Sequence, residues 1–263
     1  MRKYMVVYRS VVMEHLQYGA QIAVGFISYF IIIFIQIYLW NYMYGESGAL
    51  IAGYTKQQMI WYVMITEIIW FGTRTTTVTK QAAGDIKNGN IAYMINKPYH
   101  YALYILTKYT GEWSIRLPIY AALAGCMGML MVGGLSGFRP AALIAALPVM
   151  ILGVTINGVF KLSISLISFW TEDSNPFQLL YDKLLLVIGT IFPLEVFPVP
   201  LQPLFKMTPI YTVCYGPAKL LVDFSREKYI EILLAQALYL ACGLGVLFLL
   251  YNRGVKKLYV NGG

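Results

Sequence analysis

Three polar side chains lie inside long apolar runs of the sequence, where an ionisable or amide group is costly to bury. Glu67 lies midway in the run 59–76, and Lys161 follows Asn157 by four residues in the run 141–170. Polar residues in a membrane-spanning segment mark a substrate path or a paired group. We predict that Glu67 and Lys161 form an ion pair, or that Glu67, Asn157 and Lys161 give a polar face to a translocation path, or that they are structural. In the structural alternative, a neutral Glu67 bonds a neighbouring helix and Lys161 snorkels to the interface.

An enzyme active site is not expected. Residues 134–137 have the pattern G-x-S-G of intramembrane serine proteases, but Ser136 would need a histidine base on a later span, and His15 and His100 both precede it. The twelve acidic residues are scattered, whereas a magnesium diphosphate site needs clustered ones. The phosphate-binding pattern G-x-x-x-x-G-K is absent as well. We therefore predict no catalytic residue and no cofactor bound by this chain.

The composition is that of an integral membrane protein. Of the 263 residues, 59% are hydrophobic and 12% are charged, against roughly 25% charged residues in a soluble domain. The charged residues cluster between apolar runs, which favours an all-α bundle over a transmembrane barrel. Basic cytoplasmic loops explain the net charge of +8, so no nucleic-acid partner is predicted. The three cysteines lack a C-x-x-C spacing, and no metal site is expected.

Six apolar runs approach the roughly 20 residues that a helix needs to cross a bilayer. They cover residues 20–44, 59–76, 115–132, 141–170, 179–197 and 230–251. The fifth has the shortest apolar core and is interrupted by Pro193 and Pro198. We therefore predict one polytopic domain, residues 1–263, with six transmembrane helices.

The basic residues between these runs predict the orientation. Thirteen Lys and Arg residues fall on the side of both termini and six on the other side. Because cytoplasmic loops carry the excess of Lys and Arg, both termini and the 77–114 loop are predicted to be cytoplasmic.

The N-terminal 18 residues are predicted to form an amphipathic helix in the cytoplasmic membrane interface. A stripe at helical spacing contains Tyr4, Met5, Tyr8, Val11, Val12 and Leu16. A polar segment that frays into water is the alternative.

Residues 193–229 are rich in proline and strongly apolar, which is unusual for a loop in water. We predict short re-entrant helices that dip into the outer leaflet, with their broken backbone buried in protein or lining a cavity. A surface loop folded onto the bundle is the alternative.

The cytoplasmic loop contains the stretch "GDIKNGNIAYMINKP", residues 84–98. Asp85 can cap a short helix and Gly89 can supply a turn, so the stretch is predicted to form one or two short helices. The stretch contains more apolar residues than a solvated turn usually has, among them Ile86, Ile91 and Tyr93. Their number indicates a docking surface.

This stretch resembles the coupling segment of the membrane subunit of ABC-2 type ABC transporters, in particular a bacterial subgroup of permeases of similar length. The resemblance extends over nearly the whole chain, to the N-terminal helix, the six spans, Phe169 and Trp170 at the end of the fourth span, and "PLEVFP" at residues 193–198.

The resemblance implies an ATP-driven export permease of the bacterial cell membrane that works by alternating access. It implies a separate ABC ATPase, in two copies, that binds ATP and Mg, and a second permease subunit, identical or not. The residues implied in ATPase coupling are Asp85, Ile86, Lys87, Asn88, Gly89, Asn90 and Pro98. Those implied in an outer gate are Pro193, Glu195, Phe197 and Pro198.

A gradient-driven secondary transporter or channel that needs no ATPase is the competing hypothesis. It predicts an internal repeat with broken spans at matching positions of the two halves. The sequence has one broken region, after the fifth run. Neither hypothesis defines the transported substrate, because no recognition motif is present.

Overall fold

The computed structural model describes residues 2–17, 19–45, 49–74, 77–135, 140–171 and 173–261. Within these residues the secondary structure is helical, with one isolated bridge between Ile51 and Tyr54. The prediction of an all-α protein is therefore confirmed for this part of the chain. Four of its helices are long and apolar enough to cross a membrane: α2 (Gly19–Tyr44), α6 (Tyr101–Met131), α7 (Pro140–Leu166) and α12 (Arg226–Asn261).

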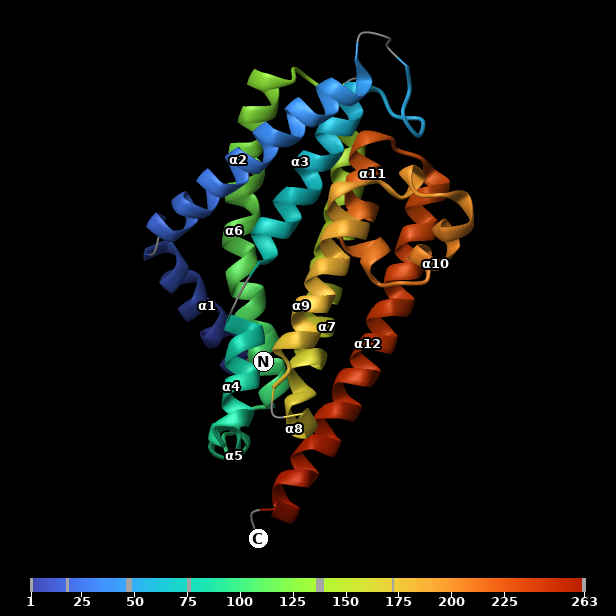
Figure 1. Ribbon diagram of the computed structural model, residues 1–263. Helices are drawn as coiled ribbons and strands as arrows, with labels where there is room; N and C mark the ends of the chain where they lie inside the picture. Colours follow the sequence, from blue (N-terminus) through green and yellow to red (C-terminus); the bar gives the residue numbers. More distant parts are fainter. Residues whose placement is uncertain are drawn as a thin grey trace.

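The long helices run along the long axis of the molecule, with α2 inclined to the others (Figure 1). Helix α7 packs along α12, and α3 (Lys56–Thr73) packs along α6 and against α2. Thr55 caps α3 in a capping box with Gln58, which satisfies donors at the first turn. Every residue of α3 from Met59 to Ile69 is buried, so this helix lies in the core of the bundle.

Two of the six predicted spans fall outside the four long apolar helices. The second coincides with α3, which has 18 residues and contains Glu67. The fifth coincides with α9 (Asn175–Leu184), which continues into the π-helical segment η2 (Leu185–Ile191). The chain leaves the helical conformation at Phe192, directly before Pro193. A proline cannot continue a helix without losing a backbone hydrogen bond, so the early end of this segment follows from the sequence.

The helix that contains the predicted third span begins well before Ile115. Helix α6 begins at Tyr101, so the second half of the predicted 77–114 loop is helical. Lys108 and Glu112 made this part look like a loop, but the buried face contains Ile105 and Tyr109 and keeps the segment packed in the bundle.

Short elements gather at the two ends of the bundle (Figure 1). The end near the C-terminus has η1 (Thr77–Gln81), α4 (Ala82–Lys87), α5 (Asn90–Ile95) and α8 (Ser168–Thr171). The opposite end has η3 (Leu194–Val196), η4 (Val199–Leu201), α10 (Gln202–Lys206), η5 (Tyr211–Tyr215) and α11 (Gly216–Val222). Residues 193–222 therefore form a series of short helices, as predicted.

Helix α1 (Arg2–Gln17) packs along the first half of α6. Val11 is buried against Gly111, where a side chain on Gly111 would meet Val11 at 2.9 Å. Further along, His15 Nε2 lies 3.8 Å from the buried carboxylate of Glu112. The apolar side chains on the other face remain exposed, including Met5, Val6, Met13 and Leu16. The predicted amphipathic helix is thus present, and one face of it is docked on protein.

Candidate functional site

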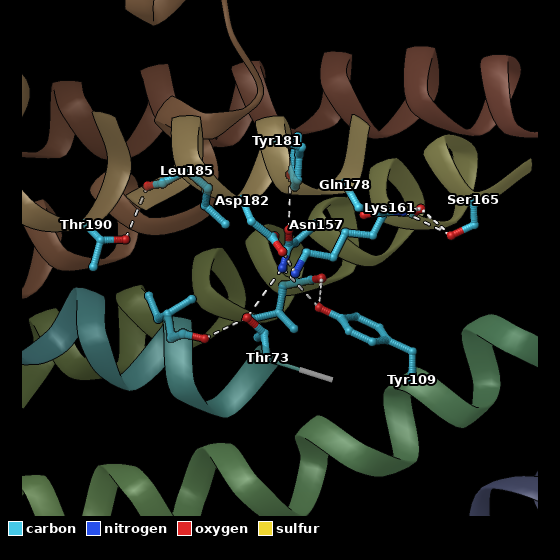
Figure 2. Close-up of polar contacts among 12 residues, drawn as sticks. Thr73, Tyr109, Asn157, Lys161, Ser165, Gln178, Tyr181, Asp182, Leu185 and Thr190 are labelled. Carbon is cyan, nitrogen blue, oxygen red and sulfur yellow. Dashed lines mark hydrogen bonds and ion pairs between the residues drawn. The ribbon is translucent and has the colours of Figure 1, made fainter. Parts of the chain in front are cut away.

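Asn157 is the centre of a hydrogen-bond network inside the bundle (Figure 2). Its amide donates to Tyr109 Oη at 3.3 Å and to Thr73 Oγ1 at 3.4 Å, and its carbonyl accepts from Tyr181 Oη at 3.0 Å. The partners belong to α6, α3 and α9, while Asn157 belongs to α7 and is fully buried. Buried amides need such partners, because an unpaired polar group in a low-dielectric interior is costly. One side chain therefore links α7 to three neighbouring helices.

Lys161 lies one helical turn after Asn157 and is ion-paired across to α9. Its Nζ is 2.9 Å from Asp182 Oδ1 and 5.9 Å from the ring centroid of Trp70. The approach to Oδ1 does not have hydrogen-bond geometry, so the contact is mainly a charge attraction. Only 4% of Lys161 is exposed, whereas the side chain of Asp182 is 36% exposed. Asp182 thus connects a buried cation to the surface of the chain.

Gln178 ties α9 to the backbone of α7 beside this ion pair. Its Nε2 donates to the carbonyl oxygen of Lys161 at 2.6 Å and to Ser165 Oγ at 3.0 Å. Ser165 in turn donates to the same carbonyl oxygen at 3.1 Å. The region around Asn157 and Lys161, which we term the inner network, therefore fixes α9 against three successive turns of α7, at Asn157, Lys161 and Ser165.

The predicted ion pair between Glu67 and Lys161 is wrong. Lys161 pairs with Asp182, and Glu67 forms no ion pair within the part of the chain that the structure describes. Only 2% of Glu67 is exposed, and its Oε2 has no hydrogen-bond partner there. Lys161 does not snorkel either, because its ammonium group ends at Asp182 inside the bundle. Of the three residues singled out, Asn157 and Lys161 are close together and Glu67 stands apart.

A second buried lysine lies at the opposite end of the molecule. Lys219, on α11, is 5% exposed, and its Nζ lies 2.8 Å from Asp223 Oδ2 and 3.3 Å from Glu195 Oε1. The same ammonium group is 4.3 Å from the ring centroid of Tyr54, a distance typical of cation–π contacts. Lys228 adds a further contact with Asp223 at 3.6 Å. We term these residues, together with Tyr215, the outer cluster.

Glu195 collects hydrogen bonds from segments far apart in the sequence. Tyr54 Oη donates to its Oε2 at 3.0 Å and Tyr215 Oη donates to its Oε1 at 2.7 Å. Burial, and then the nearby Glu195 charge, raise the pKa of Tyr54 above its usual value, so this phenol remains a donor. The Lys219 hydrogen bond holds the pKa of Asp223 below its usual value. The carboxylate of Glu195 therefore joins η3, the turn before α3 and η5.

The other predicted gate residues flank Glu195. Pro193 immediately precedes η3, and Pro198 immediately precedes η4. The ring of Phe197 lies edge-on to Phe205, with centroids 4.8 Å apart. The four predicted gate residues thus form one short, proline-bounded segment packed on α10.

The α4–α5 segment contains six of the seven predicted coupling residues, and Pro98 follows three residues after α5. The structure divides the set into two groups. Ile86 and Ile91 are buried, and Asp85 accepts a hydrogen bond from Tyr101 Oη at 2.7 Å. These side chains attach the segment to the bundle. The docking surface predicted from all the apolar residues is therefore smaller than expected. The exposed residues of the predicted set are Lys87, Asn88, Gly89, Asn90 and Pro98.

Gly89 makes the turn between α4 and α5 possible. Its φ of +73° is left-handed, a conformation that costs a residue with a Cβ about 1–2 kcal/mol. A Cβ built at this position would meet no atom within 4 Å, so conformation and not space explains the glycine. The turn presents the exposed residues at the tip of the segment.

Neither cluster forms a metal site or a catalytic constellation. Among the described residues, no group of three or more His, Cys, Asp and Glu side chains could hold a metal ion. Ser136 lies outside the described residues. The chemistry that the clusters support is charge pairing and hydrogen bonding between helices.

The long apolar helices and the polar groups buried between them define a polytopic helical membrane protein. The sequence model of the ABC-2 family transporter proteins matches residues 30–262, and the chain belongs to this family. It is therefore the membrane permease of an ABC transporter, a transport component and not an enzyme. A comparison with curated proteins finds no match.

Proposed function

We propose that the chain is one permease subunit of an ATP-driven exporter, with six spans in a single domain, residues 1–263. Helices α2, α6, α7 and α12 supply four spans, and α3 and α9 with η2 supply the other two. Because α3 is enclosed by protein, it can span the membrane with Glu67 in its middle. The 10 residues of α9 and the 7 of η2 extend about 25 Å at ~1.5 Å per residue, close to the hydrocarbon thickness.

The orientation that we propose has both termini in the cytoplasm of a bacterial cell. The excess of Lys and Arg supports it. The arrangement of the helices is consistent with it, since α4, α5, α8 and the C-terminus lie at one end of the molecule (Figure 1). The short helices of residues 193–222 are then at the outer face, where we propose that they re-enter the outer leaflet.

The α4–α5 turn is the observation that carries the coupling proposal. We propose that Lys87, Asn88, Gly89, Asn90 and Pro98 contact a separate ABC ATPase, while Asp85 and Ile86 hold the segment in place. A turn with its tip exposed and its flanks anchored transmits a push into the bundle, because Asp85 bonds Tyr101 of α6 and α4 packs on α7. ATP and Mg would be held by two copies of the ATPase.

The working unit that we propose contains a second permease subunit, identical or homologous. ATP binding would close the ATPase dimer and move the two α4–α5 segments, so that the path between the permeases opens alternately to each side. Asn157 and Lys161 would support the wall of this path, and Asp182 would reach the surface of the wall. Glu67 would be a further polar position along the path. Pro193, Glu195, Phe197 and Pro198 would belong to the outer gate.

Three variants test the coupling. Gly89→Ala places a Cβ in a left-handed turn, and Gly89→Asn should restore function, because Asn adopts this conformation more easily. Gly84→Ala adds the same methyl group where no atom lies within 4 Å and the backbone is helical, so it is the matched control.

The measurements are co-purification of the chain with its ATPase and ATP hydrolysis by the complex. We expect Gly89→Ala to reduce both several-fold, with Gly84→Ala and Gly89→Asn near wild type. Equal activity of Gly89→Ala and Gly84→Ala would contradict the coupling role. Transport into vesicles that contain the chain without ATPase, driven by an ion gradient, would instead favour a secondary transporter.

A further inference from the structure

Helix α1 lies on the side of α6 away from α12 (Figure 1). A groove with an apolar lining lies between α1 and α6. It has a volume of about 380 Å³ and is lined by Tyr4, Met5, Tyr8 and Thr107. The two tyrosine hydroxyls are already bonded: Tyr4 Oη accepts from the backbone N–H of His100 at 3.0 Å, and Tyr8 Oη donates to Ser114 Oγ at 3.1 Å. The rings, a thioether and a methyl group therefore remain for an occupant, which must be apolar.

Cations border this groove along α1. Arg2, Met5 and Arg9 follow one another at i, i+3 and i+7, so the groove residue Met5 and both arginines share one helix face. Both arginines are exposed and form no ion pair with the described residues, and Glu14 is the first acidic residue of α1. Lys3 and Lys108 are engaged, since Lys3 donates to the carbonyl oxygen of Pro98 and Lys108 to Gln81 Oε1. Two unpaired positive charges are thus available for an anion.

The rest of the exposed surface of α1 is suited to lipid. Met5 and Val6 are 66% and 60% exposed, and Met13 and Leu16 are at least half exposed. A helix with apolar side chains outward and arginines beside them is typical of a segment in the membrane interface. An occupant that is apolar at one end and anionic at the other is available there in the form of a phospholipid.

We propose that the α1–α6 groove binds an acyl chain of an anionic glycerophospholipid, with the lipid phosphate at Arg2 and Arg9. The proposal rests on the interfacial position of α1 proposed above and requires neither an ATPase nor ATP. The lipid would extend the contact between α1 and α6, a contact that also includes the turn before α6 through Tyr4 and His100. Anionic lipid would thereby stabilise the docked position of α1 next to the α4–α5 segment.

The test uses the full chain in nanodiscs of phosphatidylglycerol and phosphatidylcholine in equal amounts with identical acyl chains. Lipids that stay bound after release from the nanodisc are counted by native mass spectrometry. We expect phosphatidylglycerol to be retained in preference to phosphatidylcholine. Each arginine should contribute a factor of about five to this preference. Arg2→Gln/Arg9→Gln should abolish the preference and leave weak binding of both lipids. Lys256→Gln/Lys257→Gln removes the same charge from the exposed end of α12 and should change nothing.

Thr107→Trp fills the groove and should reduce retention of both lipids. Met5→Trp fills the groove from the α1 side. The thermal midpoint of each variant shows whether it is folded, so the test does not depend on Thr107→Trp alone. Equal retention of the two lipids by the wild-type chain would overturn the proposal. A preference that survives Arg2→Gln/Arg9→Gln, or retention that survives both groove-filling variants, would also overturn it. Since no ATPase is present, these outcomes are independent of the coupling experiment.

Discussion

The two buried lysines of this chain are stabilised in different ways. Lys161, within the bundle, has one carboxylate partner, Asp182, and is surrounded by the neutral hydrogen bonds of the inner network. Lys219, near the end of the bundle, has two carboxylate partners, Glu195 and Asp223, and a tyrosine ring. The inner network uses few charges and many neutral groups, whereas the outer cluster uses several charges.

The difference agrees with the cost of charge in the two environments. Burying an ion deep in a low-dielectric interior is expensive, and neutral amides and hydroxyls that are fully paired are cheaper. Near water, extra carboxylates can remain partly hydrated, as the 52% exposed side chain of Asp223 does. The inner network is therefore suited to hold helices in place, and the outer cluster is suited to contacts that break and reform.

The largest effect is expected for Asn157→Leu in the inner network. The change removes three hydrogen bonds between helices and leaves the hydroxyls of Tyr109 and Tyr181 with fewer partners. We expect the free energy of unfolding in detergent to fall by about 3 kcal/mol. Ser163→Ala, on the same helix, is the control, since Ser163 Oγ bonds only within α7, to the carbonyl oxygen of Val159. A loss no greater than that of Ser163→Ala would mean that the network does not hold the helices.

The next effect is an asymmetry within the Lys161 pair. Asp182→Asn leaves a nearly buried cation without its counter-charge and should lower the free energy of unfolding by about 2 kcal/mol. Breaking a fully buried pair costs ~3–5 kcal/mol, and the cost is smaller here because Asp182 is 36% exposed. Lys161→Met leaves only a carboxylate that water can reach and should cost less. A double-mutant cycle measured by unfolding should give a coupling energy for this pair. In the cycle with Glu67→Gln and Lys161→Met the two effects should be additive. A coupling energy in this cycle would support an ion pair between Glu67 and Lys161 and would contradict the structure.

A smaller effect on stability, with a larger effect on opening, is expected for Glu195→Gln in the outer cluster. The amide has one oxygen and one NH2 group where the carboxylate has two oxygens, so at these positions it accepts from only one of Tyr54 and Tyr215 and donates to the other hydroxyl. It also loses the charge attraction to Lys219, and stability should fall by about 1 kcal/mol. Glu231→Gln is the matched control, because Glu231 also bonds a lysine and a tyrosine, Lys206 and Tyr211, but in an exposed position. Such surface pairs contribute about 0–1 kcal/mol.

The readout is labelling of Val213→Cys by a water-soluble maleimide, since Val213 is fully buried in η5, behind the cluster. Glu195→Gln should accelerate the labelling and Glu231→Gln should not. All backgrounds must also lack the native cysteines, since Cys214 is adjacent and Cys126 and Cys242 are exposed. Equal labelling rates would show that Glu195 does not restrain the outer end.

The sequence identified the polar residues of both regions more readily than their partners. Asn157 and Lys161 stood out because each interrupts an apolar run, which is a local property, whereas Glu195 came from the resemblance of "PLEVFP" to the family. Neither Asp182 nor Lys219 was singled out from the sequence, although each neutralises a partner in space. Lys161 and Asp182 are 21 positions apart, and Lys219 and Glu195 are 24 positions apart. Both pairs join different helices, so they depend on how the helices pack.

The same limit applies to the tyrosines. The sequence contains 22 of them, and nothing local distinguishes Tyr54, Tyr109 and Tyr181 from those of an aromatic belt. Their hydroxyls become informative only when packing leaves them beside Glu195 or Asn157. The all-α class and the long helices, by contrast, follow from runs of apolar residues, which are visible in the sequence. The start of α6 at Tyr101 was missed because charged residues such as Lys108 and Glu112 interrupt the apolar pattern there. The packing of this part of the helix against α1 and η1 is not visible in the sequence.

The smallest effect is a dependence of stability on pH that Asp223, in the outer cluster, should contribute. The pKa of Asp223 is lowered by its hydrogen bond with Lys219, so the folded state favours the charged carboxylate. The contribution of this group is therefore fully present above the unfolded pKa of about 3.9 and is lost as the pH falls through the lower folded value. The thermal midpoint of the wild-type chain should fall between pH 5 and pH 3 by more than that of Asp223→Asn. Asp173→Asn is the control, since its carboxylate forms no ion pair with the described residues; an acid-induced loss that is identical in wild type and Asp223→Asn would place the pH-sensitive groups elsewhere.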